Sequence, residues 1–127
     1  MPVIYTSATI SLAVLEILVH VDSSALLAAY CAVRGTFDED LVAEIKRKDL
    51  PGNWREFPAP RSTQQTGDDW VSQGTSAVLK VPSTIIPSEQ NYLFNPSHPD
   101  FKKIVIADSQ PLDVDPRLLD PPGKQNN

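Results

Sequence analysis

Proline is the residue that most limits what this chain can fold into. The 127 residues include twelve prolines against five glycines. Each proline fixes φ at about −65° and removes a backbone hydrogen-bond donor, so it interrupts helices and central strands. The composition therefore disfavours a bundle of long helices and predicts short elements joined by fixed bends.

The apolar stretch over residues 8–21 is predicted to form a helix. A short β-branched run over 2–5 precedes it and suits a strand, and Thr6, Ser7 or Thr9 can cap the helix. Because the stretch is apolar on nearly every side, we expect other elements to cover it on several sides. It is the predicted central core helix.

The later elements are predicted to be short. Residues 41–50 fit helical and strand periodicity equally well and stay unassigned, and the segment 82–101 is too irregular to form one element. We expect Trp54 and Phe57 to pin a proline-rich segment to the core. The other predicted elements are strands over 28–37, 77–81 and 101–106, an extended edge over 111–119, and a surface helix over 62–74, capped by Ser62 or Thr63, with Trp70 turned inward and Gly74 beyond its end.

These elements predict the α+β class, with short mixed strands around a buried central helix. No internal repeat or linker is visible, so a single domain is expected over residues 1–119, followed by a disordered tail over 120–127.

Charge and cysteine content exclude several classes of function. The net charge is −5 and the eleven basic residues are scattered, so a surface for nucleic-acid phosphates is not expected. The single cysteine, Cys31, rules out an internal disulfide, suits a reducing compartment and is expected to be a small buried hydrophobe. No apolar run is long enough to cross a membrane and no basic signal region begins the chain, which predicts a cytoplasmic protein.

Glu16 is the one acid inside LAVLEILVH, residues 12–20. A buried carboxylate needs a raised pKa, a partner or an opening to a cleft. His20 lies four residues further on the same helix face and could be that partner. The pattern alone leaves a structural pair and a functional carboxylate nearly balanced.

Longer blocks of the sequence resemble the RES domain family, the toxins of RES–Xre toxin-antitoxin systems. The blocks run in the family's order and cover nearly the whole chain. They are VIYTSATISLAVLEILVHVD (3–22), LPGNWREFPAP (50–60), STQQTGDDWVSQGTSAVLKVPSTIIPSEQNYLFNPSHPDF (62–101) and PLDVDPRLL (111–119).

The resemblance implies an architecture like that of ADP-ribosyltransferase toxins and an enzyme that degrades NAD⁺. Such an enzyme splits the bond between nicotinamide and ribose, with phosphate as acceptor. NAD⁺ is then the substrate, and no metal or further cofactor is implied. An Xre-type helix-turn-helix antitoxin is the implied protein partner.

The resemblance also assigns roles to individual residues. The family's glutamate falls on Glu16 and the serine of its VPS motif on Ser83, both as catalytic residues. Tyr5, Asn91 and Asn95 match positions expected to bind substrate. A carboxylate would stabilise the oxocarbenium-like cation that forms when nicotinamide leaves, and a tyrosine ring could stack on nicotinamide.

Each of these residues also has a structural interpretation. Tyr5 could be a core aromatic, and Ser83 and Asn95 could hold turns through their own backbone. His98 is expected to be a loop histidine and His20 a structural partner.

The pattern of the family that this chain resembles includes an arginine and a Gly-Gly-Arg-Trp-Asn stretch upstream of residues 3–7. Arg34, Arg55 and Arg61 lie in other blocks of the sequence, so they do not match that arginine. Such an arginine would hold phosphates and balance a pocket carboxylate. We expect Met1 to be internal in the natural protein; gene decay and completion by another chain are the alternatives. A sheet edge left open would favour association, including a homodimer.

Three functions remain open from the sequence. The first is NAD⁺ degradation, the second an inactive RES-like module that binds its antitoxin, and the third transfer of ADP-ribose to a protein.

Overall fold

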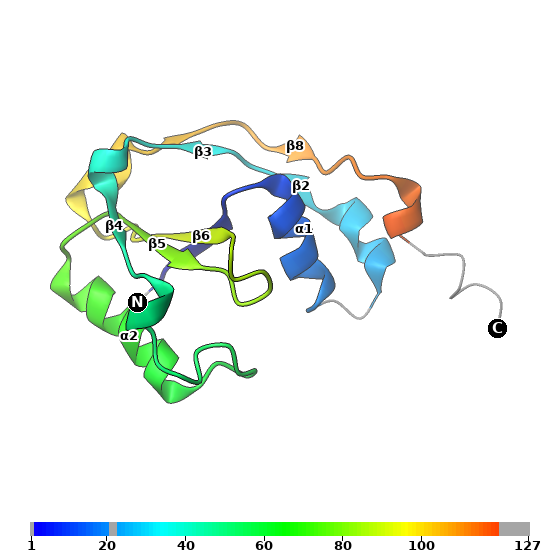
Figure 1. Ribbon diagram of the computed structural model, residues 1–127. Coiled ribbons are helices and arrows are strands. Elements are labelled where there is room, and N and C mark those ends of the chain that lie inside the picture. The colour runs from blue at the N-terminus through cyan, green and yellow to red at the C-terminus, as the bar shows by residue number, and fades with distance from the viewer. Residues whose placement is uncertain (1, 21–22, 120–127) are drawn as a thin grey trace.

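A computed structural model describes residues 2–20 and 23–119. Its largest sheet has four strands in the order β1-β6-β5-β4 (Figure 1). β1 and β5 both run antiparallel to β6, whereas β4 runs parallel to β5. The strands are β1 (Ile4–Ser7), β4 (Val42–Glu44), β5 (Val78–Pro82) and β6 (Gln90–Phe94).

Two short ladders extend the fold away from this sheet. They pair β2 (Cys31–Ala32) with β8 (Gln110–Pro111) and β3 (Gly35–Thr36) with β7 (Val105–Ile106). The two α-helices are α1 (Ile10–Leu18) and α2 (Arg61–Gln73). Short 3-10 helices occupy Ser24–Ala29, Glu39–Leu41, Arg47–Asp49, Pro99–Lys103 and Pro116–Leu118. The α+β class is thereby confirmed.

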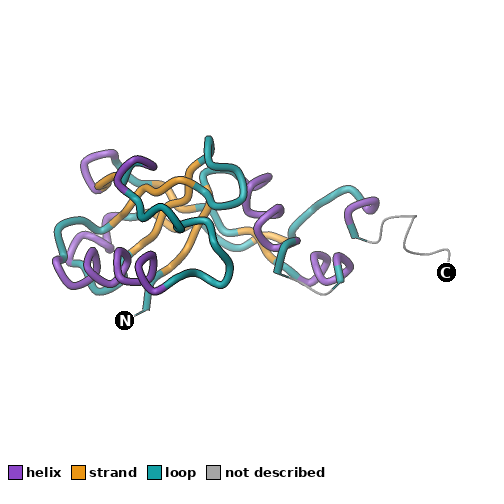
Figure 2. Tube along the Cα trace, turned by 60° about the horizontal axis from the view of Figure 1, so that its bottom comes forward, coloured by secondary structure: helices purple, strands orange, loops and turns teal. Residues whose placement is uncertain are grey.

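Strand alternation divides the core between the two faces of the sheet. Val78 and Phe94 point to one face, where they pack with Leu41 and Ile104. Leu79 points to the other face, which α2 covers with its buried residues Trp70 and Val71. Figure 2 shows the sheet and α2 towards one end of the molecule and the C-terminal 3-10 helix at the other.

The first helix is shorter and less covered than the sequence predicts. Thr9 caps it, because its hydroxyl accepts a hydrogen bond from the backbone N–H of Leu12 at 3.1 Å. Only Leu12 and Val14 are buried within it, whereas Ile10 is 58% exposed. An apolar groove of 410 Å³ runs between α1 and residues 112–118.

In the part of the chain that the structure describes, no helix could cross a membrane.

Several local predictions are wrong for one physical reason. The predicted strand over 28–37 is the end of a 3-10 helix followed by two separate two-residue strands. A 3-10 helix likewise occupies the first half of the predicted strand over 101–106, and only Val105–Ile106 form a strand. Cys31 and Phe57 are both exposed rather than buried. Each prediction relied on local apolar character, whereas burial depends on which distant segment lies opposite.

The second helix follows the prediction closely. α2 turns Trp70 inward, and the Trp70 indole N–H donates to the Ser76 hydroxyl at 2.8 Å. Gly74 ends the helix with a φ of +62°, the left-handed conformation that favours glycine. The capping residue at the other end is Pro60, not Ser62 or Thr63.

A pair of glycine substitutions tests this end of α2. A Cβ at Gly74 or at Gly67 would meet no atom within 4 Å, so only the backbone differs between the two positions. Gly74→Ala should lower the free energy of unfolding by about 1–2 kcal/mol, because its left-handed φ is strained for alanine. Gly67→Ala, inside the helix, should raise it by about 0.5–1 kcal/mol. Urea denaturation followed by circular dichroism measures both, and equal effects would contradict the assigned helix end.

Candidate functional site

The carboxylate of Glu16 lies at the centre of a hydrogen-bonded cluster between α1 and the sheet. Asn91 donates from Nδ2 to Glu16 Oε2 at 2.8 Å, and the Ser7 hydroxyl donates to the same oxygen. The Tyr5 hydroxyl lies 3.3 Å from Glu16 Oε1. We call these four residues the Glu16 cluster. The partner that a half-buried carboxylate needs is thus a set of neutral donors.

The register of β1 on β6 brings these side chains to one face. Ser7 lies directly opposite Asn91, and Tyr5 lies two residues earlier on the same strand. Because side chains two apart on a strand share a face, Tyr5, Ser7 and Asn91 all point to the side where α1 packs. α1 begins three residues after β1 ends and carries Glu16 back over them.

Asn91 is fully buried and joins the cluster together. Its Oδ1 accepts a hydrogen bond from the Tyr5 hydroxyl at 2.8 Å, while its Nδ2 faces Glu16 and the backbone oxygen of Thr6, at 3.2 Å. The amide cannot be reversed without placing its oxygen against the carboxylate, which would repel it. Asn91 therefore fixes both the tyrosine hydroxyl and the glutamate.

The two oxygens of Glu16 have different surroundings. Oε2 accepts from both Ser7 and Asn91, on the inner side of the cluster. Oε1 has only the long contact to Tyr5, on the exposed side, and the Tyr5 proton has the closer acceptor in Asn91. One carboxylate oxygen is held by two short hydrogen bonds, and the other, the open oxygen, has no short hydrogen bond within the described residues.

Tyr5 shows the electrostatic effect of this arrangement. Partial burial of the phenol raises its pKa well above the ordinary value, and the neighbouring Glu16 charge and hydrogen bond raise it further. The side chain as a whole is 55% exposed. Tyr5 therefore keeps its proton and presents its ring to solvent.

Ser83 lies near this end of the sheet but outside the cluster. Its backbone N–H donates to the Glu89 oxygen at 2.9 Å, and its hydroxyl accepts from the N–H groups of Ile85 and Ile86. The side chain is fully buried. Because Val81 pairs with Asn91, Ser83 lies just beyond the cluster and holds the turn that joins β5 to β6.

The structure does not bring Asn95 to Glu16. Asn95 follows β6 at its opposite end, and its Oδ1 accepts from the Ser97 N–H at 3.0 Å. His98 Nδ1 accepts from the Asp100 N–H at 3.0 Å and caps a 3-10 helix. The ring of His20 lies 5.7 Å from that of Phe57. These polar residues hold local structure around the sheet.

Ser7 is the cluster residue that the sequence analysis missed. The sequence pattern indicates only a helix cap at Ser7, because the predicted strand ends at residue 5. Extending that strand by two residues places Ser7 on the same face as Tyr5, because strand side chains alternate. That alternation was the available signal.

Comparisons with known proteins give a consistent answer. The model of the RES domain matches residues 1–115. A protein named Toxin Res from Yersinia enterocolitica is 38% identical over 117 residues, which cover 91% of this chain and 76% of that protein. A Toxin Res from Photorhabdus laumondii is 35% identical over 105 residues, 82% of this chain and 67% of its own length.

A third relative carries a different name. A protein from Sphingobium sp. named Prs ADP-ribosylating toxin is 37% identical over 120 residues, covering 92% of this chain and 74% of that protein. The family match covers nearly all of the chain, including every residue of the Glu16 cluster. The chain therefore belongs to the RES domain family.

Proposed function

We propose that this protein is a toxin that cleaves the nicotinamide–ribose bond of NAD⁺, with phosphate as the acceptor. The observation that carries this proposal is the geometry of Glu16. One carboxylate oxygen is fixed by Ser7 and Asn91, and the other is open on the exposed side. A carboxylate held in this way suits a reaction in which positive charge develops on a sugar carbon.

The chemical step follows from that charge. The bond between ribose C1′ and the nicotinamide nitrogen breaks, and its electron pair leaves with nicotinamide. C1′ then carries oxocarbenium character, which the open oxygen of Glu16 stabilises. A phosphate oxygen forms the new bond to C1′, and the proton of the acceptor passes to solvent.

The other predicted residues receive supporting roles in the proposal. The exposed ring of Tyr5 would stack on nicotinamide. Asn91 would bind substrate indirectly, by holding Tyr5 and Glu16. Ser83 would act through the turn beside the cluster. Asn95 would contact substrate only if the nucleotide extended to the opposite end of β6.

We also propose a protein partner and a compartment. A cytoplasmic toxin that consumes NAD⁺ requires an inhibitor in its own cell, and an Xre-type helix-turn-helix antitoxin is the proposed one. Size-exclusion chromatography of the two purified proteins tests the complex. Independent elution would contradict it.

A second candidate is transfer of ADP-ribose to a protein. The name of the Sphingobium relative, Prs ADP-ribosylating toxin, favours it. Both reactions share the cleavage step and differ in the acceptor. Incubation with radiolabelled NAD⁺ and purified Prs distinguishes them, since label in protein supports transfer and label only in small molecules supports the phosphate acceptor.

The first prediction from the proposed function concerns Glu16. Glu16→Gln removes the charge and keeps the size, so nicotinamide release should fall at least about 100-fold, because a charge aimed at the transition state is lost. Release is followed by NMR in the presence of NAD⁺ and phosphate. Glu39→Gln, at an exposed carboxylate, is the control and should keep full activity. Equal activity in the two variants would exclude Glu16 as the catalytic group.

The second prediction concerns Asn91. Asn91→Asp places a second carboxylate against Glu16 and leaves buried donors and acceptors mismatched. The free energy of unfolding should fall by about 2–4 kcal/mol. Asn53→Asp is the control, because Asn53 uses only its Oδ1, which accepts from Ser62. Urea denaturation of both variants is the measurement, and a stable Asn91→Asp protein would argue against the described cluster.

The third prediction concerns the Tyr5 phenol. Its raised pKa means that the native state keeps this proton where the unfolded chain, with an ordinary pKa of about 10, loses it. The stabilisation is complete below pH 10 and is lost as the pH rises further. Ultraviolet titration should show that Tyr5→Phe removes the last phenol to ionise. Loss of a phenol that titrates near 10 would contradict this.

A further inference from the structure

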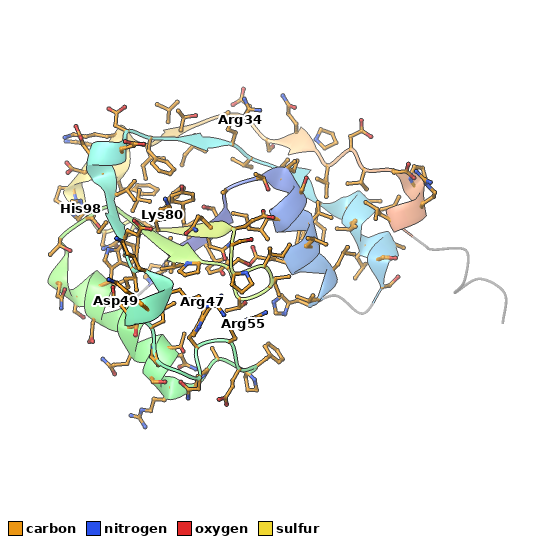
Figure 3. All side chains as sticks on the ribbon, in the orientation of Figure 1. Arg34, Arg47, Asp49, Arg55, Lys80 and His98 are labelled. Carbon is orange, nitrogen blue, oxygen red and sulfur yellow. The ribbon has the colours of Figure 1, made fainter. Side chains whose placement is uncertain are left out.

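We propose that Arg55 is a phosphate-binding residue of the same site and that Arg47 assists it. The inference rests on the proposed function, because it assigns the part of the site that would hold the diphosphate of NAD⁺. The two arginines, labelled in Figure 3, come from the segment between β4 and α2, which lies outside the Glu16 cluster.

Two contacts link the segment of Arg55 to residues that neighbour the elements of the Glu16 cluster. Its Nε donates to the backbone oxygen of Thr84 at 3.0 Å. Thr84 follows Ser83 in the β5–β6 turn, and that turn leads directly to Asn91. On the other side, the ring of Phe57, two residues after Arg55, lies 5.7 Å from that of His20, which follows the end of α1. The segment 55–57 therefore contacts both the β5–β6 turn and the residues just after α1.

The Thr84 contact also orients the guanidinium. With Nε bound to the protein, the two Nη groups remain to bind a ligand, and their planar pair matches two oxygens of a phosphate. The Arg47 guanidinium lies 5.8 Å from the centre of the ring of Trp54, and Trp54 directly precedes Arg55 in the sequence. Figure 3 labels both arginines, and the hydrogen bond to Thr84 attaches Arg55 to the β5–β6 turn.

Neither arginine is neutralised within the described residues. The ion pairs found there involve Lys80, Lys103 and Arg117, and none includes Arg47 or Arg55. In a chain with a net charge of −5, two arginines of one segment that form no ion pair among the described residues offer positive charge to an anion.

The separation from Glu16 also fits the substrate. The diphosphate is attached to the ribose through C5′, away from the C1′ carbon that reacts. A phosphate site must therefore lie beside the carboxylate and not in contact with it. Arg55 is compatible with this condition, because it forms no ion pair with Glu16 and its Nε is bonded to Thr84, in the turn that precedes the strand of Asn91.

Calorimetric titration of ADP-ribose into the full chain tests this inference. Arg55→Ala should weaken binding about 10- to 100-fold, the loss expected for a charged hydrogen bond. Arg55→Lys should recover part of it, because an ammonium keeps the charge without the planar pair. Arg34→Ala, an exposed arginine on another part of the molecule (Figure 3), should bind like the wild type. Thermal melting establishes that each variant is folded.

A turnover measurement separates phosphate binding from a general effect. Nicotinamide riboside has the reacting bond but no phosphate, so Arg55→Ala should reduce nicotinamide release from NAD⁺ and leave release from the riboside unchanged. Wild-type protein that does not bind ADP-ribose, unchanged binding by Arg55→Ala, or an equal loss in Arg34→Ala would each overturn the inference. Arg55-dependent binding without any nicotinamide release would refute the proposed cleavage and leave the inference standing.

Discussion

The buried amide of Asn91 is the constraint on which the site depends. An amide with no exposure to water must find its partners within the protein, or its burial costs several kcal/mol. Here those partners come from β1 and α1, so satisfying one side chain fixes a strand, a helix and the Glu16 carboxylate together. Polar contacts hold α1 against the sheet, which is compatible with apolar residues such as Ile10 remaining exposed.

The sequence predicted the features that depend on neighbouring residues. Thr9 as a cap, Trp70 as the buried residue of α2 and Gly74 beyond its end are local signals, and the structure contains all three. The strand over 28–37 was wrong, because β2 and β3 exist only through pairing with residues 105–111. No local pattern contains that pairing.

Glu16 illustrates the same limit within the site. Its isolation in an apolar run predicted correctly that it needs a partner. The sequence indicated His20, four residues away, as a possible partner. In the structure Glu16 accepts a hydrogen bond from Asn91, 75 residues away, and the His20 ring lies against that of Phe57. The register of β1 on β6 decides which residue is the partner, because it places Asn91 opposite Ser7. That long-range pairing cannot be read from the sequence around Glu16.

The neutral character of these partners bears on catalysis. Tyr5, Ser7 and Asn91 orient the carboxylate without neutralising it. In the proposed reaction its charge is therefore available for the cation that would form at C1′. In the proposed site Arg55, bonded to Thr84, would attract phosphate without competing for Glu16. Under both proposals the two charges would act on different parts of one substrate.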